Sequence, residues 1–277
     1  MKRFIVALIA LLLSLVLWGP SQAQGVMYAV DRASDLLYKI DPATANATVV
    51  GNTGADVSFS GLSWSGSKMY ACDLWTGSAW SLATINLNTG AATSIGPQGY
   101  ANVMAIAHVG GTLYGFEFDA GLGTFNTTTG AFTPIPSTLP THMYAADLDD
   151  SSGLLYTVGE NSFLYTVNVN SGTATAVGST GISFETVNSV KEIGLTYNAM
   201  DGQLYLLGND VAGSGDRLYR INKSTGAATL IGSTPLIEAD ALEFVPIPEP
   251  STLILLGIGA ICLLGRKSAS VCRYQGT

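Results

Sequence analysis

Two acidic side chains, Glu192 and Asp240, are the best-placed candidates for chemistry in this sequence. Both precede short apolar stretches that read as inner strands of a repeat, so we expect both carboxylates near the centre of the fold. Hydrolysis of a glycosidic bond uses two carboxyl groups about 5–9.5 Å apart, one as acid and the other as base or nucleophile. The sequence does not give that separation, so a glycoside hydrolase or lyase stays an alternative, and no residue is assigned as catalytic.

The densest acidic cluster is the run Asp147-Leu148-Asp149-Asp150-Ser151-Ser152. Carboxylate and hydroxyl oxygens are suitable ligands for calcium. The run lacks the spacing of a complete calcium-binding loop, and Asp and Ser residues are equally suited to a hairpin turn. We therefore expect a solvated turn here and predict no metal site and no cofactor.

Histidine and cysteine form no catalytic pattern that the sequence reveals. His108 and His142 lie one repeat apart but at different positions of the repeat, and neither belongs to a Ser-His-Asp or Cys-His arrangement. Cys72 is the only cysteine between residues 24 and 246, while Cys262 and Cys272 lie near the C-terminus. Free cysteine of this kind usually packs as a small buried residue. The sequence thus predicts a protein that is not an enzyme.

The composition favours short strands over long helices. The 277 residues include 32 glycines, and only 12% are charged, which is typical of many strands joined by tight turns. The net charge is −8, and no basic stripe lies between Arg32 and Lys223. Because nucleic-acid-binding surfaces gather Lys and Arg on one face, we expect no nucleic-acid partner.

One sequence motif recurs five times in the chain. It consists of apolar residues with an aromatic, an Asn or Asp, a short polar turn, and then Thr with further apolar residues. Its aligned threonines follow one another at intervals of 40 to 54 residues: Thr48, Thr93, Thr133, Thr175 and Thr229. Each copy has the pattern of a β-hairpin.

A second hairpin precedes the last four copies, so a unit of about 40–50 residues holds four strands, as a propeller blade does. The first copy begins directly at residues 27–30, and the last is followed by an unpaired strand at residues 241–245. We predict that these two ends pair and close a five-bladed β-propeller over residues 24–246. An open β-solenoid or a sandwich is the structural alternative.

An aromatic residue occupies the same strand position in every unit, at Tyr28, Tyr70, Tyr114, Tyr156 and Tyr205. Five equivalent rings could stack on sugars. Repeated aromatics more often pack one blade against the next, and we expect that role here.

The N-terminus reads as a secretory signal peptide over residues 1–23. A basic start is followed by an apolar stretch at residues 4–18 and by small residues at Ser21 and Ala23, the pattern of export through the Sec pathway. We expect cleavage between Ala23 and Gln24. An uncleaved membrane helix is the alternative.

The C-terminus has three ordered parts. Residues 247–251 contain Pro248, Glu249 and Pro250, residues 252–265 form an apolar stretch, and residues 266–277 begin with Arg266 and Lys267. The prolines keep the preceding chain extended. The apolar stretch is expected to be a transmembrane helix, with the basic tail in the cytoplasm.

This ending resembles the PEP-CTERM sorting signal of Gram-negative bacteria. The resemblance implies processing by an exosortase near Pro248, Glu249 and Pro250, transient residence in the inner membrane, and delivery to the cell surface or an exopolysaccharide matrix. Two features depart from the pattern. The apolar run at residues 252–264 is short for a hydrocarbon core of about 30 Å, and residues 268–277 extend past the basic pair. A plain C-terminal anchor is the alternative.

The expected function is that of an exported, non-enzymatic cell-surface or biofilm-matrix protein that uses a propeller as an interaction platform. Exopolysaccharide or other surface proteins are its expected ligands. A carbohydrate-active enzyme working on the same matrix is the main alternative, and a membrane-tethered periplasmic module is a third.

Overall fold

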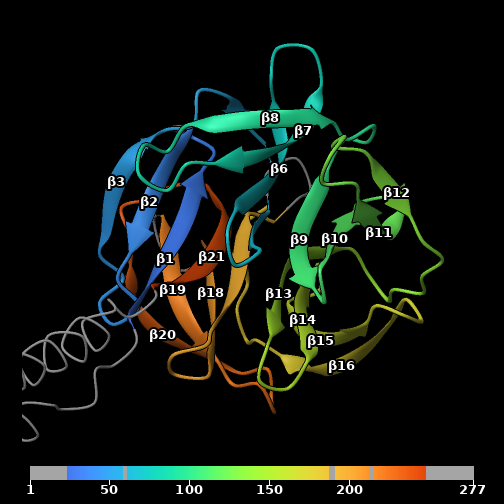
Figure 1. The fold of residues 1–277 in the computed structure, drawn as a ribbon. Coiled ribbons are helices and arrows are strands. Elements are labelled where there is room, and N and C mark those ends of the chain that lie inside the picture. The colour runs from blue at the N-terminus through green and yellow to red at the C-terminus, as the bar shows by residue number, and fades with distance from the viewer. Residues whose placement is uncertain (1–23, 59–60, 187–190, 212–214, 248–277) are drawn as a thin grey trace, which may run out of the picture. The chain divides into compact units, whose positions relative to one another are not determined.

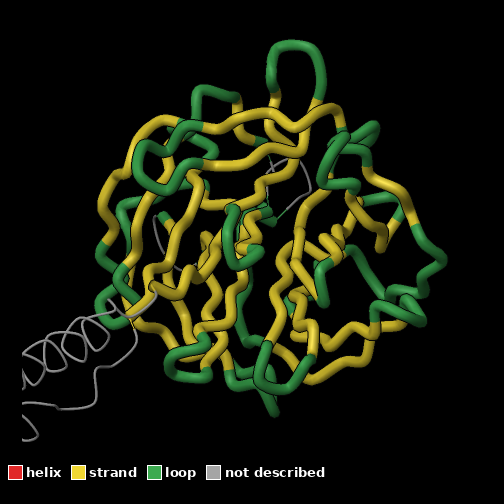
Figure 2. The backbone as a smooth tube through the Cα atoms, in the orientation of Figure 1, coloured by secondary structure: helices red, strands yellow, loops and turns green. Residues whose placement is uncertain are grey.

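The computed structural model describes residues 24–247 except 59–60, 187–190 and 212–214. Residues Gly25–Val245 form one compact unit. All regular elements of the described residues are strands, which form five antiparallel sheets (Figure 1). The tube view in Figure 2 shows that short loops join them. We call the sheets blades 1 to 5.

Blades 1 and 2 hold the first part of the chain. Blade 1 has the strand order β21 (Ala239–Ile247), β1 (Gln24–Asp31), β2 (Leu36–Ile40) and β3 (Ala47–Asn52). Blade 2 has β4 (Asp56–Val57) and β5 (Leu62–Trp64) both paired with β6 (Met69–Trp75), followed by β7 (Trp80–Ile85) and β8 (Ala92–Pro97).

Blades 3 to 5 follow in chain order. Blade 3 consists of β9 (Val103–Val109), β10 (Thr112–Glu117), β11 (Gly121–Phe125) and β12 (Phe132–Pro134). Blade 4 consists of β13 (Met143–Asp149), β14 (Leu154–Gly159), β15 (Phe163–Asn168) and β16 (Thr173–Ser179). Blade 5 consists of β17 (Ile193–Asn198), β18 (Gln203–Asn209), β19 (Asp216–Ile221) and β20 (Ala228–Ser233).

The predicted closure of the ring is confirmed. Strand β21, from the end of the unit, lies beside β1 in the sheet of blade 1 (Figure 1). A hydrogen bond from the Arg32 amide to the Glu238 carbonyl (2.8 Å) continues this junction. Residues 24–247 therefore form an all-β five-bladed propeller in which one blade is built from both ends of this segment. Because β21 pairs with β1, the inner edge of β1 is not left open to edge-to-edge aggregation.

Each pair of neighbouring blades encloses its own apolar core. The five buried clusters join blades 1 and 2, 2 and 3, 3 and 4, 4 and 5, and 5 and 1. The repeated tyrosines lie in these cores: Tyr28, Tyr70, Tyr156 and Tyr205 are 5–7% exposed, and Tyr114 packs against the core of blades 3 and 4. The expectation that they pack blade against blade is confirmed.

Glycines recur where the outer strand of one blade contacts the hairpin turn of the next blade through the backbone. Gly51, in the outer strand of blade 1, lies against the backbone of Thr89 and Gly90 in the turn of blade 2. Gly90 has φ of +81°, which favours glycine. The Ala92 amide then donates to the Thr53 carbonyl (2.8 Å). Backbone contact of this kind leaves no room for a β-carbon at either glycine.

Candidate functional site

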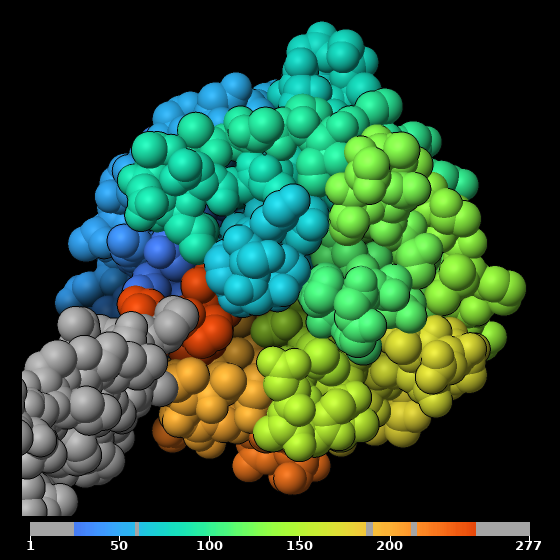
Figure 3. All heavy atoms as spheres, viewed as in Figure 1, coloured from blue at the N-terminus to red at the C-terminus, as the bar shows by residue number. Residues whose placement is uncertain are grey.

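The inner strands of all five blades converge on one small cavity. It is lined by β5, β9, β13, β17 and β21 and has a volume of about 10 Å³. A cavity of this size holds about one water molecule, so a sugar ring does not fit. The space-filling view in Figure 3 likewise shows atoms filling the centre of the face that it presents.

Small residues from every blade make the centre this narrow. In blades 2 to 5 they lie two positions before the residue that pairs with the repeated tyrosine, and the full set is Gly61, Ala105, Ala145, Gly194 and Ala241. A β-carbon on Gly61 would come within 2.7 Å of the Ile106 nitrogen, and one on Gly194 would overlap Leu242. The strands touch through their backbones, and glycine is required where the approach is closest.

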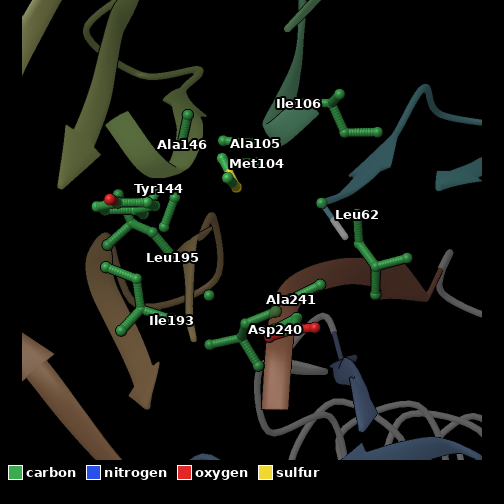
Figure 4. Close-up of a pocket in the computed structure, with 14 residues that line it drawn as sticks. Leu62, Met104, Ala105, Ile106, Tyr144, Ala146, Ile193, Leu195, Asp240 and Ala241 are labelled. Atoms are coloured by element: carbon green, nitrogen blue, oxygen red, sulfur yellow. The ribbon is translucent and has the colours of Figure 1, made fainter. Parts of the chain in front are cut away.

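Asp240 is the acidic residue of this lining. Figure 4 shows it among apolar side chains from the other blades, including Met104, Tyr144 and Ile193. Asp240 is 3% exposed, and neither of its carboxylate oxygens accepts a hydrogen bond from a described residue. Burial, followed by the negative charge of Glu192, raises its pKa well above the usual range.

Arg32 joins Asp240 to Glu192. Its Nε and Nη2 lie 2.9 and 2.5 Å from Glu192 Oε1, its Nη2 lies 2.9 Å from Glu238 Oε2, and its Nε lies 3.9 Å from Asp240 Oδ2. Burial raises the pKa of Glu192, although the Arg32 charge lowers it. The Glu192 and Asp240 oxygens are thus at most about 7 Å apart, a limit that overlaps the lower part of the range of about 5–9.5 Å for glycosidase carboxylates.

Asp216 is another buried carboxyl group close to Asp240. Its Oδ2 accepts a hydrogen bond from the Ala239 amide (2.7 Å), and its Oδ1 has no partner among the described residues. Burial raises its pKa to about 7. Among the described residues no group of three or more His, Cys, Asp or Glu side chains is arranged to hold a metal ion. The arrangement is suited to holding protons on carboxyl groups that face one guanidinium.

A second buried acidic pair, Asp147 and Glu243, lies on the inner strands β13 and β21. Asp147 Oδ2 accepts hydrogen bonds from the Tyr197 amide (2.6 Å) and the Thr196 hydroxyl (3.0 Å). Glu243 Oε1 accepts one from the Trp64 amide (2.8 Å). Burial raises the pKa of both groups, that of Asp147 to about 7, and the Asp147 charge raises the pKa of Glu243 further. Glu243 was not predicted as a buried group, because the strand at residues 241–245 carries a single acidic residue, as a half-exposed strand does.

The expectation of a solvated turn at residues 147–152 is wrong for two of its members. The turn exists, with the Gly153 amide donating to the Asp149 carbonyl (2.8 Å). However, Asp147 is 8% exposed and Asp149 is 1% exposed. Burial opposes the Asp149 charge, but hydrogen bonds from Lys223, Ser151 and Ser152 outweigh it and lower the Asp149 pKa. Both carboxylates accept hydrogen bonds from blade 5, Asp147 from β17 and Asp149 from Lys223, which sequence spacing does not reveal.

The other predicted candidates lie apart from one another. His142 stacks on Phe118 (3.9 Å between ring centroids) and its Nδ1 lies 3.0 Å from Glu160 Oε2, whereas His108 lies half-buried on β9. Cys72 is fully buried, with its Sγ 3.0 Å from the Val103 carbonyl oxygen, and burial raises its pKa. The packing role expected for Cys72 is confirmed.

Two surface grooves were not predicted. One, of about 420 Å³, is lined by Trp64, Lys68 and Asn86 among others. The other, of about 270 Å³, is lined by Glu117, Phe118, Asp119 and His142. Both volumes are close to those of small-ligand sites, about 300–1,000 Å³. A lone Trp in a strand gives no sequence signal for such a groove.

A model of the PEP-CTERM protein-sorting motif matches residues 246–268. The chain therefore carries this motif, which implies export, membrane-associated sorting toward the cell surface and processing by an exosortase. The predicted signal cleavage at Ala23, the motif residues Pro248, Glu249 and Pro250, the helix at 252–265 and the tail at 266–277 lie outside the described residues. Within the described part of the chain no helix is long and apolar enough to cross a membrane.

One solved structure with a TM-score above 0.5 shares the fold, and a second shows a weaker likeness. A chain in the crystal structure of a nidogen/laminin complex aligns with a TM-score of 0.52 at 16% identity, covering 79% of this chain and 82% of that one. A structural genomics protein of unknown function from Bacteroides thetaiotaomicron aligns with a TM-score of 0.45 at 16% identity, covering 76% of this chain and 58% of the other. No curated protein matches the sequence. At this identity the likeness concerns the fold alone.

Proposed function

We propose that this chain is an exported, non-enzymatic protein of the cell surface or extracellular matrix, with its propeller as a rigid binding platform. It leaves the cytoplasm through the Sec pathway of a Gram-negative bacterium, loses residues 1–23, and is processed by an exosortase. The observation that carries this proposal is the position of the sorting motif, which begins at residue 246, within β21 (Ala239–Ile247).

The order of strand and motif suits release of an intact fold. Cleavage near Pro248, Glu249 and Pro250 leaves all of β21 in the mature chain, so blade 1 keeps its inner strand. Loss of β21 would expose the edge of β1 and open the ring, and an open edge promotes aggregation. A platform that is sorted by its C-terminus needs a cleavage site outside the closing strand, and this sequence provides one.

The absence of enzymatic activity is proposed on the geometry of the centre. Glu192 and Asp240 are 4% and 3% exposed, and the cavity beside Asp240 has room for about one water. A carbohydrate-active enzyme is the second candidate, favoured by the proximity of those two carboxylates on one guanidinium. If the protein is such an enzyme, the wild type should release reducing ends from a polysaccharide, and Glu192→Gln and Asp240→Asn should not. If it is a binding platform, the wild type should release none.

The sorting step is tested by fractionating cells that produce the full chain. A variant with Pro248→Ala, Glu249→Ala and Pro250→Ala should stay in the membrane fraction, while the wild type reaches the surface or the medium. Ser251→Ala, immediately after the motif triplet, is the matched control and should behave as the wild type. Equal delivery of the triple variant and the wild type would contradict exosortase sorting.

A further inference from the structure

Blade 2 carries an open groove beside its two hairpin turns. Its lining comes from the end of β5, the β5–β6 turn and the β7–β8 hairpin, and includes Trp64, Lys68, Thr84, Asn86, Leu87 and Thr93. The volume of about 420 Å³ is suited to one or two sugar rings and lies within the usual size range of ligand sites. An aromatic side chain and several polar groups therefore meet in one hollow.

Trp64 is anchored by a backbone hydrogen bond and by packing of its side chain. Its amide donates to the buried Glu243 Oε1 (2.8 Å), which fixes the end of β5 to β21. Its side chain is half-buried and packs partly against the core between blades 1 and 2. An indole anchored in this way loses little conformational freedom when a ligand stacks on it.

In blade 5 the aromatic ring at the position of Trp64 is covered by a lysine side chain. Tyr197 pairs with Leu204 as Trp64 pairs with Met69, so the two rings are equivalent. Lys223 lies over the Tyr197 ring, 4.9 Å from its centroid, and its Nζ is 2.7 Å from Asp149 Oδ2. In blade 2 the residue at the position of Lys223 is Leu87, which has no charge to form such a bridge. The blade 2 aromatic is left without this cover.

The polar groups of the groove define the chemistry of its ligand. Lys68 is exposed, and Thr84 and Thr93 bring hydroxyl groups to the lining. The lining contains no Asp or Glu. A pyranose ring presents C–H groups that suit the negative face of an indole, and a carboxylate forms a charge-assisted bond with a lysine. By contrast, the second surface groove carries Glu117 and Asp119, which would repel a carboxylate.

We propose that the blade 2 groove binds a carboxylated saccharide, with a uronic acid ring stacked on Trp64 and its carboxylate paired with Lys68. This inference rests on the proposed function, because it supplies a ligand for the platform. Since the protein as a whole carries a charge of −8, attraction is confined to the groove. Added salt should therefore weaken binding by screening a single ion pair.

Titration calorimetry of the mature protein with trigalacturonic acid tests the proposal, with its methyl ester as the uncharged probe. We expect the acid to bind at least tenfold more tightly than the ester. Lys68→Ala should raise the Kd of the acid about tenfold and leave that of the ester unchanged. Trp64→Ala should abolish binding of both.

Trp75→Ala is the control, because Trp75 is an exposed tryptophan at the other end of the β6 strand of blade 2. It should bind as the wild type does. The Trp64 variant could lose binding by misfolding. Lys68→Glu tests the groove without that risk, because Lys68 is exposed, and it should abolish binding of the acid. Equal affinity for acid and ester, loss in Trp75→Ala, or no binding by the wild type would overturn the groove assignment. A protein that reaches the surface but does not bind would leave the sorting proposal intact.

Discussion

Arg32 and Glu192 are 160 residues apart in sequence, yet two hydrogen bonds join the guanidinium to one carboxylate oxygen. Arg32 follows the last residue of β1, and Glu192 precedes β17, so the pair ties blade 1 to blade 5 where the ring closes. Glu192 is 3% exposed at its side chain, and Arg32 is 22% exposed. The closure of the propeller thus depends on charge as well as on the pairing of β21 with β1.

Removal of the guanidinium should destabilise the protein. Arg32→Met leaves Glu192 buried without its partner, and a broken pair of this kind costs about 3 kcal/mol in the free energy of unfolding. Urea unfolding followed by tryptophan fluorescence measures the loss. Arg220→Met, at an exposed position in β19, should change stability by less than about 0.5 kcal/mol. Similar small effects for both variants would show that the pair does not stabilise the closure.

Stability should fall as the pH rises from about 4 to about 7. Asp240 and Asp216 have folded-state pKa values above their unfolded values, that of Asp216 about 7. The folded protein therefore holds more protons than the unfolded chain in this window, so raising the pH favours unfolding until both states are ionised. Asp31, Glu192, Glu238 and Arg32 face the same carboxyl groups.

Asp240→Asn should make that pH dependence shallower. The amide keeps the size of the side chain, carries no charge at any pH, and loses no hydrogen bond that Asp240 makes with a described residue. Thermal unfolding at pH 5 and pH 8 checks this, and the variant should gain most at pH 8. Asp56→Asn, at an exposed position in β4, is the control. An unchanged slope in Asp240→Asn would contradict a protonated Asp240 in the folded protein.

The narrow centre should not tolerate one added methyl group. A β-carbon at Gly194 would overlap the Leu242 and Ala241 backbone, so Gly194→Ala should cost about 3 kcal/mol or more, or prevent folding. Gly153→Ala is the comparison, because Gly153 has φ of +69° but no atom within 4 Å of the added carbon. It should cost only the left-handed strain of about 1–2 kcal/mol. Equal costs for both variants, measured by urea unfolding, would refute close contact between the inner strands.

Cys72 should resist alkylation until the protein unfolds. Its side chain is fully buried, the Gly61 amide lies 3.2 Å from its Sγ, and burial raises its pKa, so little reactive thiolate reaches solvent. Iodoacetamide labelling followed by peptide mapping should modify Cys72 only at urea concentrations within the unfolding transition. Rapid labelling in buffer would show that blades 2 and 3 open locally at this point.

The sequence was sufficient to predict the blades and their closure, because the signals are local and repeated. Thr-Gly turns, alternating strands and the unpaired strand at residues 241–245 each depend on neighbours in the chain. The tyrosine positions were also predicted, since every blade uses the same ring in the same core. The two-residue strand β4 was missed, because Asp56 and Val57 are too few to form a pattern.

The buried charges could not be predicted, because their environment comes from other blades. Asp147 looks like a turn residue in sequence, and only the arrival of Tyr197 and Thr196 from blade 5 buries it. Glu192 and Asp240 were correctly placed near the centre, but the size of the cavity beside Asp240 depends on small residues in five strands. The blade 2 groove depends on a difference between repeats, because Leu87 of blade 2 stands where blade 5 has Lys223. A search for what the repeats share does not detect such a difference.

Export and sorting should deliver a closed propeller that ends just after β21. The intact mass of the protein recovered from outside the cell, with its terminal peptides sequenced, tests this. The prediction is a chain that starts at Gln24, contains Ile247 and lacks Arg266 and Lys267. A recovered chain that has lost β21, or that still carries the basic tail, would contradict it.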